Sequence, residues 1–333
     1  MFQAGRIAAL CVVILWLPWG SEARATPEDA AIRVGVLQFG TMNWEMDVIR
    51  RHQLAEKQGL KLETVPLASV QALLTALQGG AVDVIVGDWI WAARQRQLNR
   101  SYSFVPYSTM AASVIVAPDS GITNFEQLRH KRIGVAGGPV NKSWILYRAF
   151  ARRQYGMDLM KDTEIKFAAP PILNALMLKG ELDAVINFWH FSSELVGRGL
   201  TPILNMEELL IAFDIKGEVP LLGWLFHTDW ALENRDRLNQ FLATSQAARE
   251  LMLRSDAEWE AIEPMQQIKS VSLRRQLRDD YRAGIPGEFS RQQVTASRQL
   301  FNLLREEGGE QVVGSIEQLP DDLFWKSLPL VRR

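Results

Sequence analysis

The sequence Ser69-Val-Gln-Ala-Leu-Leu-Thr-Ala-Leu-Gln-Gly-Gly-Ala-Val-Asp-Val-Ile-Val86 predicts an amphipathic helix followed by a buried strand. Apolar residues recur at the spacing of one helix face, Ser69 can cap the N-terminus, and Gly79-Gly80 can end the helix. The apolar run at residues 82–86 then has the length and composition of a buried strand. A helix that leads directly into such a strand is the repeating unit of an α/β fold.

The same alternation continues toward the N-terminus. Residues 33–37 predict a strand, residues 43–58 a helix stopped by Gly59, and residues 61–65 a strand ended by Pro66. Strands and helices that take turns in this way form a parallel sheet covered on both faces, with right-handed crossovers.

The pattern begins again about a hundred residues later. Four matches at an offset of 99 or 100 carry the comparison: Arg33-Val-Gly-Val36 with Arg132-Ile-Gly-Val135, Gly80-Ala-Val-Asp83 with Gly180-Glu-Leu-Asp183, Trp44 with Trp144, and Trp89 with Trp189. They predict two lobes built on one plan. The alternative is that any two strand–helix–strand units share such features.

Two strands are expected to link the lobes. Residues 111–117 form the outgoing strand, before the turn Pro118-Asp-Ser-Gly121, and residues 221–226 form the returning strand. The other expected helices are a short one through Leu128 with Thr123 and Glu126 as its capping box, residues 235–253, residues 273–281, and one after Ser290 with Gln293 in its capping box.

The first 25 residues have the features of a secretory signal. Arg6 supplies a positive charge, residues 7–19 an apolar stretch, and Ala23-Arg-Ala25 a cleavage site. The alternative is an uncleaved membrane anchor, for which the apolar run is short. Cys11, the single cysteine, lies inside this run. A periplasmic chain cleaved after Ala25 would therefore lack disulfides, thiol nucleophiles and cysteine-based metal sites.

The composition is that of a globular protein. Its 333 residues include 37 Lys and Arg against 38 Asp and Glu, and 47% are hydrophobic. The formal net charge of −1, with no block of five or more like charges, argues against nucleic acid as a partner.

Three ordered stretches carry a family resemblance: Leu74-Thr-Ala-Leu-Gln-Gly-Gly-Ala-Val-Asp83, then Val116-Ala-Pro-Asp-Ser-Gly-Ile122 with Phe125-Glu-Gln-Leu-Arg-His-Lys-Arg-Ile-Gly-Val135, and Ala175-Leu-Met-Leu-Lys-Gly-Glu-Leu-Asp-Ala-Val-Ile186. With them the sequence resembles the periplasmic solute-binding proteins of ABC importers, in the nitrate, sulfonate, taurine and thiamine-precursor group.

The resemblance implies an α/β fold of the type II periplasmic binding protein class, with two Rossmann-like lobes and a two-strand hinge. The expected divisions are a signal at residues 1–25, a first lobe at 26–115, a second lobe at 116–218, and a return to the first lobe with C-terminal helices at 219–333. It also implies a monomer without a cofactor, which binds a small organic ligand and delivers it to a membrane permease with its ATPase.

Ligands of open α/β sheets bind beyond the carboxyl ends of the strands. The predicted cleft is therefore lined by residues 39–44, 87–91, 137–144 and 187–190, with Trp224 on the returning strand as a further wall. The candidate ligand-binding residues are Phe39, Thr41, Asn43, Trp44, Asp88, Trp89, Gly138, Asn141, Trp144, Asn187, Trp189 and Trp224. Five of the nine tryptophans after residue 25 fall in the four segments, which favours an aromatic box.

Several of these side chains have an alternative interpretation. Trp44 and Trp144 lie in the first turn of expected helices and could equally pack into the core, and Asn43 could simply cap a helix. The glycine-rich turn before Asn141 could hold an anion, but Asp88 and Glu45 oppose a strongly anionic ligand. A neutral, zwitterionic or partly cationic organic molecule is therefore expected, rather than an inorganic oxyanion.

Catalysis finds little support in the sequence. The histidines His52, His130, His190 and His227 lack metal-ligand spacing, so no metal site and no catalytic residue is predicted. Asp88 and His190 could meet as an acid–base pair, although a ligand contact is the simpler reading. Two alternatives to transport stay open: an enzyme on the same scaffold, of the pyrimidine-precursor or dehydratase type, and a periplasmic sensory or accessory module.

Overall fold

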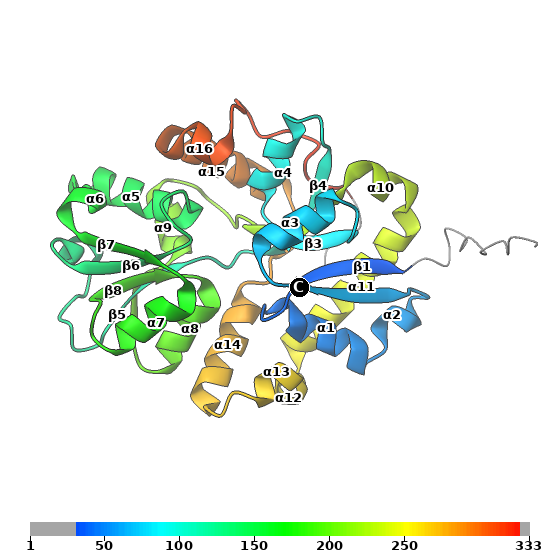
Figure 1. Ribbon diagram of the computed structural model, residues 1–333, viewed down its shortest axis with the longest axis horizontal. Helices are drawn as coiled ribbons and strands as arrows, with labels where there is room; N and C mark the ends of the chain where they lie inside the picture. Colours follow the sequence, from blue (N-terminus) through cyan, green and yellow to red (C-terminus); the bar gives the residue numbers. More distant parts are fainter. Residues whose placement is uncertain (1–30, 327–333) are drawn as a thin grey trace, which may run out of the picture. The chain divides into compact units, whose positions relative to one another are not determined.

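The computed structural model describes residues 31–326, and the predicted export signal with its cleavage site lies outside them. The described residues contain two five-stranded sheets, of order β2-β1-β3-β10-β4 and β7-β6-β8-β5-β9. The strands are β1 (Ile32–Leu37), β2 (Leu62–Leu67), β3 (Val84–Gly87), β4 (Tyr102–Ser108), β5 (Ser113–Val116), β6 (Arg132–Ala136), β7 (Glu164–Ala168), β8 (Ala184–Asn187), β9 (Thr201–Leu204) and β10 (Leu222–His227). The α/β fold predicted from the sequence is confirmed (Figure 1).

Helices separate most of the strands. They are α1 (Met42–Arg51), α2 (Leu54–Lys57), α3 (Val70–Gln78), α4 (Trp89–Arg96), the 3-10 helix η2 (Phe125–Leu128), α5 (Lys142–Tyr155), α6 (Leu159–Asp162), α7 (Pro170–Leu178), α8 (Trp189–Gly197), α9 (Met206–Ala212), α10 (Thr228–Glu233), α11 (Arg235–Arg254), α12 (Asp256–Ala261), α13 (Glu263–Gln266), α14 (Val271–Ala283), α15 (Arg291–Gly308) and α16 (Glu310–Val313). Among the described residues, none of these helices is both long and apolar enough to cross a bilayer.

The two sheets repeat one plan. In each, the second strand in the order pairs in parallel with both of its neighbours, β1 with β2 and β3, and β6 with β7 and β8. An antiparallel strand then follows, β10 beside β3 and β5 beside β8. The internal repeat expected from the sequence is therefore visible in the topology.

An Arg–Asp ion pair occupies the equivalent position in each sheet. Arg33 Nη2 lies 2.6 Å from Asp83 Oδ1, and Arg132 Nη2 lies 2.7 Å from Asp183 Oδ1. Each aspartate also accepts a 2.8 Å hydrogen bond from the backbone N–H of its arginine. The aspartate that ends each repeated motif, at residues 80–83 and 180–183, therefore links the strand that follows, β3 or β8, to the neighbouring strand, β1 or β6.

The chain crosses between the sheets more than once. It passes from β4 to β5 and from α9 back to β10. Later, α14 packs against α8, where Ser272 Oγ donates to the Gly197 carbonyl at 3.2 Å, while Leu277 and Tyr281 of α14 join the hydrophobic core under β1. Helix α14 thus contacts both halves (Figure 1).

Local capping signals were predicted with mixed success. Ser69 caps α3 and Ser290 with Gln293 forms the capping box of α15, as expected. The box at η2 is wrong by one residue, because Asn124 and Gln127 form it instead of Thr123 and Glu126.

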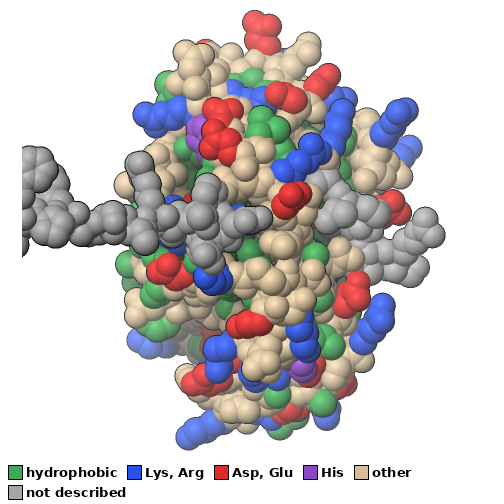
Figure 2. Space-filling view, turned by 90° about the vertical axis from the view of Figure 1, so that its right-hand side faces the viewer, with side chains coloured by type: hydrophobic (Ala, Val, Ile, Leu, Met, Phe, Trp, Pro, Cys, Tyr) green, Lys and Arg blue, Asp and Glu red, His purple; other side chains and the backbone are tan. Residues whose placement is uncertain are grey.

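Two element boundaries also differ from expectation. The helix expected at residues 43–58 is broken into α1 and α2 by Gln53, whose φ of 51° is left-handed. Strand β2 continues through Pro66 to Leu67, because an edge strand tolerates a proline that cannot donate to a neighbour. On the face shown in Figure 2, acidic and basic side chains are interspersed, in keeping with the near-balanced charge.

Candidate functional site

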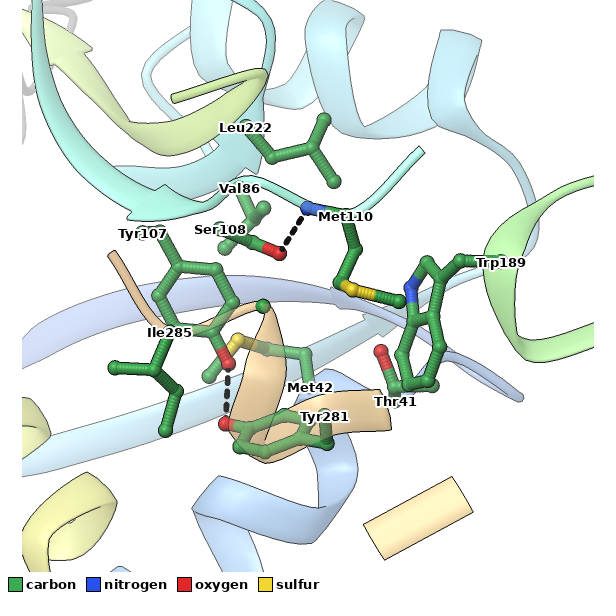
Figure 3. A pocket seen from close by; sticks show the side chains of 11 residues that line it. Thr41, Met42, Val86, Tyr107, Ser108, Met110, Trp189, Leu222, Tyr281 and Ile285 are labelled. Carbon is green, nitrogen blue, oxygen red and sulfur yellow. Dashed lines mark hydrogen bonds between the residues drawn. The ribbon is translucent and has the colours of Figure 1, made fainter. Parts of the chain in front are cut away.

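A small cavity of about 50 Å³ lies beyond the carboxyl ends of β1 and β3. The residues that line it are Thr41, Met42, Val86, Tyr107, Ser108, Met110, Trp189, Leu222, Tyr281, Gly284 and Ile285 (Figure 3). Ten of these belong to the first sheet, its connections and the region of α14. Trp189 alone comes from the other half, at the start of α8.

Trp189 lines one side of the pocket and packs against other aromatic rings. Its ring centroid lies 6.0 Å from that of Trp44 in an edge-to-face contact and 6.4 Å from that of Tyr281. Trp44 is held in turn by Trp259 at 5.7 Å and Tyr281 at 5.9 Å. Such offset contacts add stability beyond the apolar area that they bury.

Two tyrosine hydroxyls form the polar end of the pocket. Tyr107 Oη and Tyr281 Oη lie 2.8 Å apart (Figure 3). Tyr281 also donates to Glu45 Oε2 at 3.3 Å. Glu45 is fully buried, and the guanidinium of Arg249 lies 5.2 Å from the centroid of the Tyr107 ring. A buried carboxyl group and a buried guanidinium therefore lie behind the wall.

Burial shifts the proton affinities of this cluster. It raises the pKa of the Glu45 carboxyl, against the opposing effects of the Arg249 charge and hydrogen bonds from Ser245 and the two tyrosines. Burial, with the nearby Glu45 charge, also raises the pKa of Tyr107 and Tyr281. Both phenols therefore keep their protons at neutral pH.

His190 follows Trp189 and packs against its indole, with ring centroids 5.5 Å apart. Burial lowers the pKa of the imidazole to about 4, although the charge of Glu194 opposes the shift. His190 is therefore neutral at physiological pH. Within residues 31–326, no three His, Cys, Asp or Glu side chains are grouped so that they could hold a metal.

Polar contacts join the two halves beside the pocket. Lys142 Nζ, at the start of α5, lies 3.2 Å from Asp88 Oδ2. Asp88 also caps α4 by accepting from the Trp91 N–H at 3.0 Å. On α14, Asp280 accepts a 2.5 Å hydrogen bond from Ser193 Oγ of α8.

Three of the predicted site residues lie at the pocket or against its wall. Thr41 and Trp189 line it, and Trp44 supports Trp189 from behind. Asp88 reaches the opposite half, but its partner there is Lys142 rather than His190.

The structure places the other predicted tryptophans in the core rather than at the pocket. Trp89 is buried and its indole N–H donates to the Pro220 carbonyl at 2.8 Å. Trp144 is fully buried, and Trp224 is buried with its N–H donating to Ser245 Oγ at 3.3 Å. All three indoles pack into the hydrophobic core, which for Trp144 was the alternative given by the sequence.

The remaining predicted residues form hydrogen bonds or turns within their own half, or are exposed to solvent. Phe39 is 90% exposed. Asn43 donates to the Gly40 carbonyl at 2.8 Å, and Asn141 caps α5. Gly138 takes a left-handed φ of 79° in the turn before that cap, and Asn187 is buried with its amide donating to Asn174 at 2.9 Å.

The sequence profile of the bacterial extracellular solute-binding proteins, family 3, matches residues 44–256. The chain belongs to this family. No curated protein sequence matches it significantly.

Several solved structures of periplasmic binding proteins have a fold similar to that of this solute-binding protein. The alkanesulfonate-binding protein SsuA from Xanthomonas axonopodis pv. citri bound to MOPS is 19% identical with a TM-score of 0.67, over 89% of this chain and 98% of that one. The aliphatic sulphonate-binding protein SsuA from Escherichia coli is 17% identical with a TM-score of 0.70, over 92% and 95%. The nitrate-binding protein NrtA from Synechocystis is 11% identical with a TM-score of 0.55, over 78% and 71%.

These likenesses confirm the periplasmic binding protein fold that the sequence predicted. At such identities they establish the fold and carry no information on the ligand of this solute-binding protein.

Sequence reasoning missed the tyrosines of this solute-binding protein. Tyr107 lies one residue before the end of β4 and Tyr281 lies on α14, far along the chain, so no local pattern joins them. The one signal that could have found Tyr107 is its place near the end of a strand that precedes the first crossing between sheets. Met42 lies within the predicted cleft segment 39–44, although it was not named as a candidate, and Met110 gives no such signal.

Proposed function

We propose that this protein is the extracytoplasmic solute-binding component of an ABC importer, which traps a small organic molecule in the pocket that Trp189 closes. One observation carries the proposal: a pocket built on the first sheet and α14 is completed by a single indole from the other half. A ligand that touches Trp189 gains contacts only when the halves are together, so it stabilises the closed arrangement.

The size of the pocket supports a cycle of opening and closing. A cavity of about 50 Å³ has room for several water molecules, whereas sites that bury a small organic molecule are larger. Entry therefore requires Trp189 to withdraw from Tyr281 and Met110, with separation of Lys142 from Asp88.

Delivery to a membrane permease with its ATPase, from the periplasm and by a monomer, is part of the same proposal. It is supported by the family and by neighbours whose names describe periplasmic sulfonate and nitrate binding. Binding without turnover is supported by the pocket chemistry, because the eleven lining residues include no Asp, Glu, His, Lys or Cys that could act as an acid, base or nucleophile beside the two tyrosines.

Native mass spectrometry of the protein purified from its own host tests the proposal. We expect a small organic molecule to be carried through purification and recovered intact after denaturation. Its affinity, measured by titration calorimetry, should fall at least about tenfold in Trp189→Ala. Trp230→Ala, which removes a half-buried indole from α10, should leave the affinity unchanged.

Two results would count against the proposal. Equal affinities for the two variants would place the ligand elsewhere, and a chemically altered molecule after incubation would favour an enzyme.

A further inference from the structure

The walls of the pocket carry no cationic side chain. Its eleven lining residues include no Lys, Arg or His, and the large ones are two phenols, an indole and two thioethers. A buried anion needs N–H donors or a positive charge to replace its hydration. These walls offer an anion no positive charge, and the Trp189 indole is their one side-chain N–H donor.

The hydroxyl protons of the two tyrosines are used in hydrogen bonds within the wall. Tyr281 has one hydroxyl proton and donates it to Glu45 Oε2, so it must accept from Tyr107 across their 2.8 Å contact. Ser108 Oγ accepts from the Met110 N–H at 3.1 Å and keeps its own hydroxyl proton as a donor. Oxygen lone pairs are therefore what both phenols retain for a ligand.

The fixed charges around the pocket do not favour an anion either. Glu45 lies behind Tyr281, and Asp280 is its chain neighbour, bonded to Ser193 of α8 and to Gln276. Against these two carboxyl groups stands the guanidinium of Arg249 over the Tyr107 ring. The other chain neighbour of Tyr281 is Arg282, whose guanidinium is bonded to Asp256 and to the Met252 carbonyl.

From this arrangement we propose that the pocket binds an alkylammonium group, held against the faces of Trp189, Tyr107 and Tyr281. Aromatic faces attract such cations through the ring quadrupole, most strongly where water is excluded. Met42 and Met110 would pack against the alkyl groups. The inference rests on the proposed function and names the class of ligand that these walls select.

A pair of probes of equal shape tests the charge. Choline carries a trimethylammonium group, and 3,3-dimethylbutan-1-ol replaces its nitrogen with carbon. Propane-1-sulfonate supplies the anionic comparison. Each is titrated into the purified protein, with tryptophan fluorescence and calorimetry as readouts. We expect choline to bind at least about tenfold more tightly than its neutral isostere, and the sulfonate to bind least.

Variants locate the effect. Trp189→Ala should reduce the preference for choline over the isostere to about twofold or less, whereas Trp230→Ala should preserve it. Glu45→Gln keeps the size of the buried side chain but can no longer ionise. It should weaken choline and leave the isostere unchanged, and circular dichroism with the unfolding midpoint would establish that this variant folds.

The possible failures are distinct. Equal affinity for choline and its isostere, preference for the sulfonate, or no choline binding at about 10 mM would overturn the alkylammonium inference. If the molecule recovered from the host still bound in a Trp189-dependent manner, the solute-binding function would stand with another ligand class. If the protein carried no molecule and bound no probe, both proposals would fail.

Discussion

Trp44 and Trp189 meet edge to face, with ring centroids 6.0 Å apart and ring planes at 88°. Trp44 lies on α1, which follows a strand of the first sheet, and Trp189 lies on α8, which follows a strand of the second. The contact therefore links the packing of Trp44 in the first half to the position of Trp189 in the second. Stability within one half and the balance between closed and open forms can be tested separately.

Trp44→Ala removes a buried indole that supports three other rings. The free energy of unfolding should fall by about 3–5 kcal/mol, because truncation leaves a cavity in addition to the lost apolar burial. Urea titration measures the loss. Trp230→Ala, at a half-buried indole, should cost less; equal losses would mean that the aromatic cluster adds nothing beyond ordinary burial.

Lys142→Ala removes the ion pair with Asp88 and should favour the open form without ligand. The pair is partly exposed, so the population ratio should change by about fivefold at most, and less at high salt. Small-angle scattering of the unliganded protein should show a larger radius of gyration. Lys161→Ala, whose pair with Asp158 lies within one half, should not change it.

Asp183→Asn tests the ion pair with Arg132. The hydrogen bond from Arg132 is the main cause that lowers the pKa of Asp183, so the ionised form stabilises the fold above about pH 4. That stability is lost as the pH falls through the folded pKa. The variant should lose about 1 kcal/mol at pH 7, a modest amount because the pair is partly exposed.

Measured by urea unfolding, Asp183→Asn and the parent should converge in stability at acid pH. A gap that stays constant down to pH 3 would assign the loss to packing rather than to charge. Asp83→Asn, in the matching pair of the first sheet, supplies a comparison at neutral pH.

His190→Gln should make the protein less sensitive to acid. The folded pKa of about 4 lies below the unfolded value of about 6.5, so the parent loses stability as the pH falls between them, when the unfolded chain binds the proton more readily. The lost stability amounts to about 2–3 kcal/mol by pH 4.5. Unfolding midpoints measured across this range should decline less steeply in the variant; parallel declines would contradict the assignment.

The fold was predictable because its signals are local. The cap at Ser69, the helical spacing after it and the glycines that end the helix all lie within one short segment. The errors arose where neighbouring residues compete. Gln127 Oε1 accepts from the backbone N–H of both Thr123 and Asn124, so only the folded loop decides which residue caps the helix.

The pocket was only partly predictable because its members meet through topology. Trp89 and Trp189 occupy the same place after matching strands, yet Trp89 turns inward to the Pro220 carbonyl while Trp189 faces the pocket. Nothing in the motif distinguishes them. Tyr281 joins the site only because α14 lies against α8, a contact between segments that are distant in sequence.

The position of β10 has a consequence for how the chain matures. β10 pairs with β3 and β4 on either side, but it is synthesised after every strand of the second sheet. A nascent chain that stops short of residue 222 can complete one sheet and must leave two bare strand edges in the other. Such a chain is open to wrong pairing and aggregation, so prolonged chaperone contact is expected until His227 has emerged.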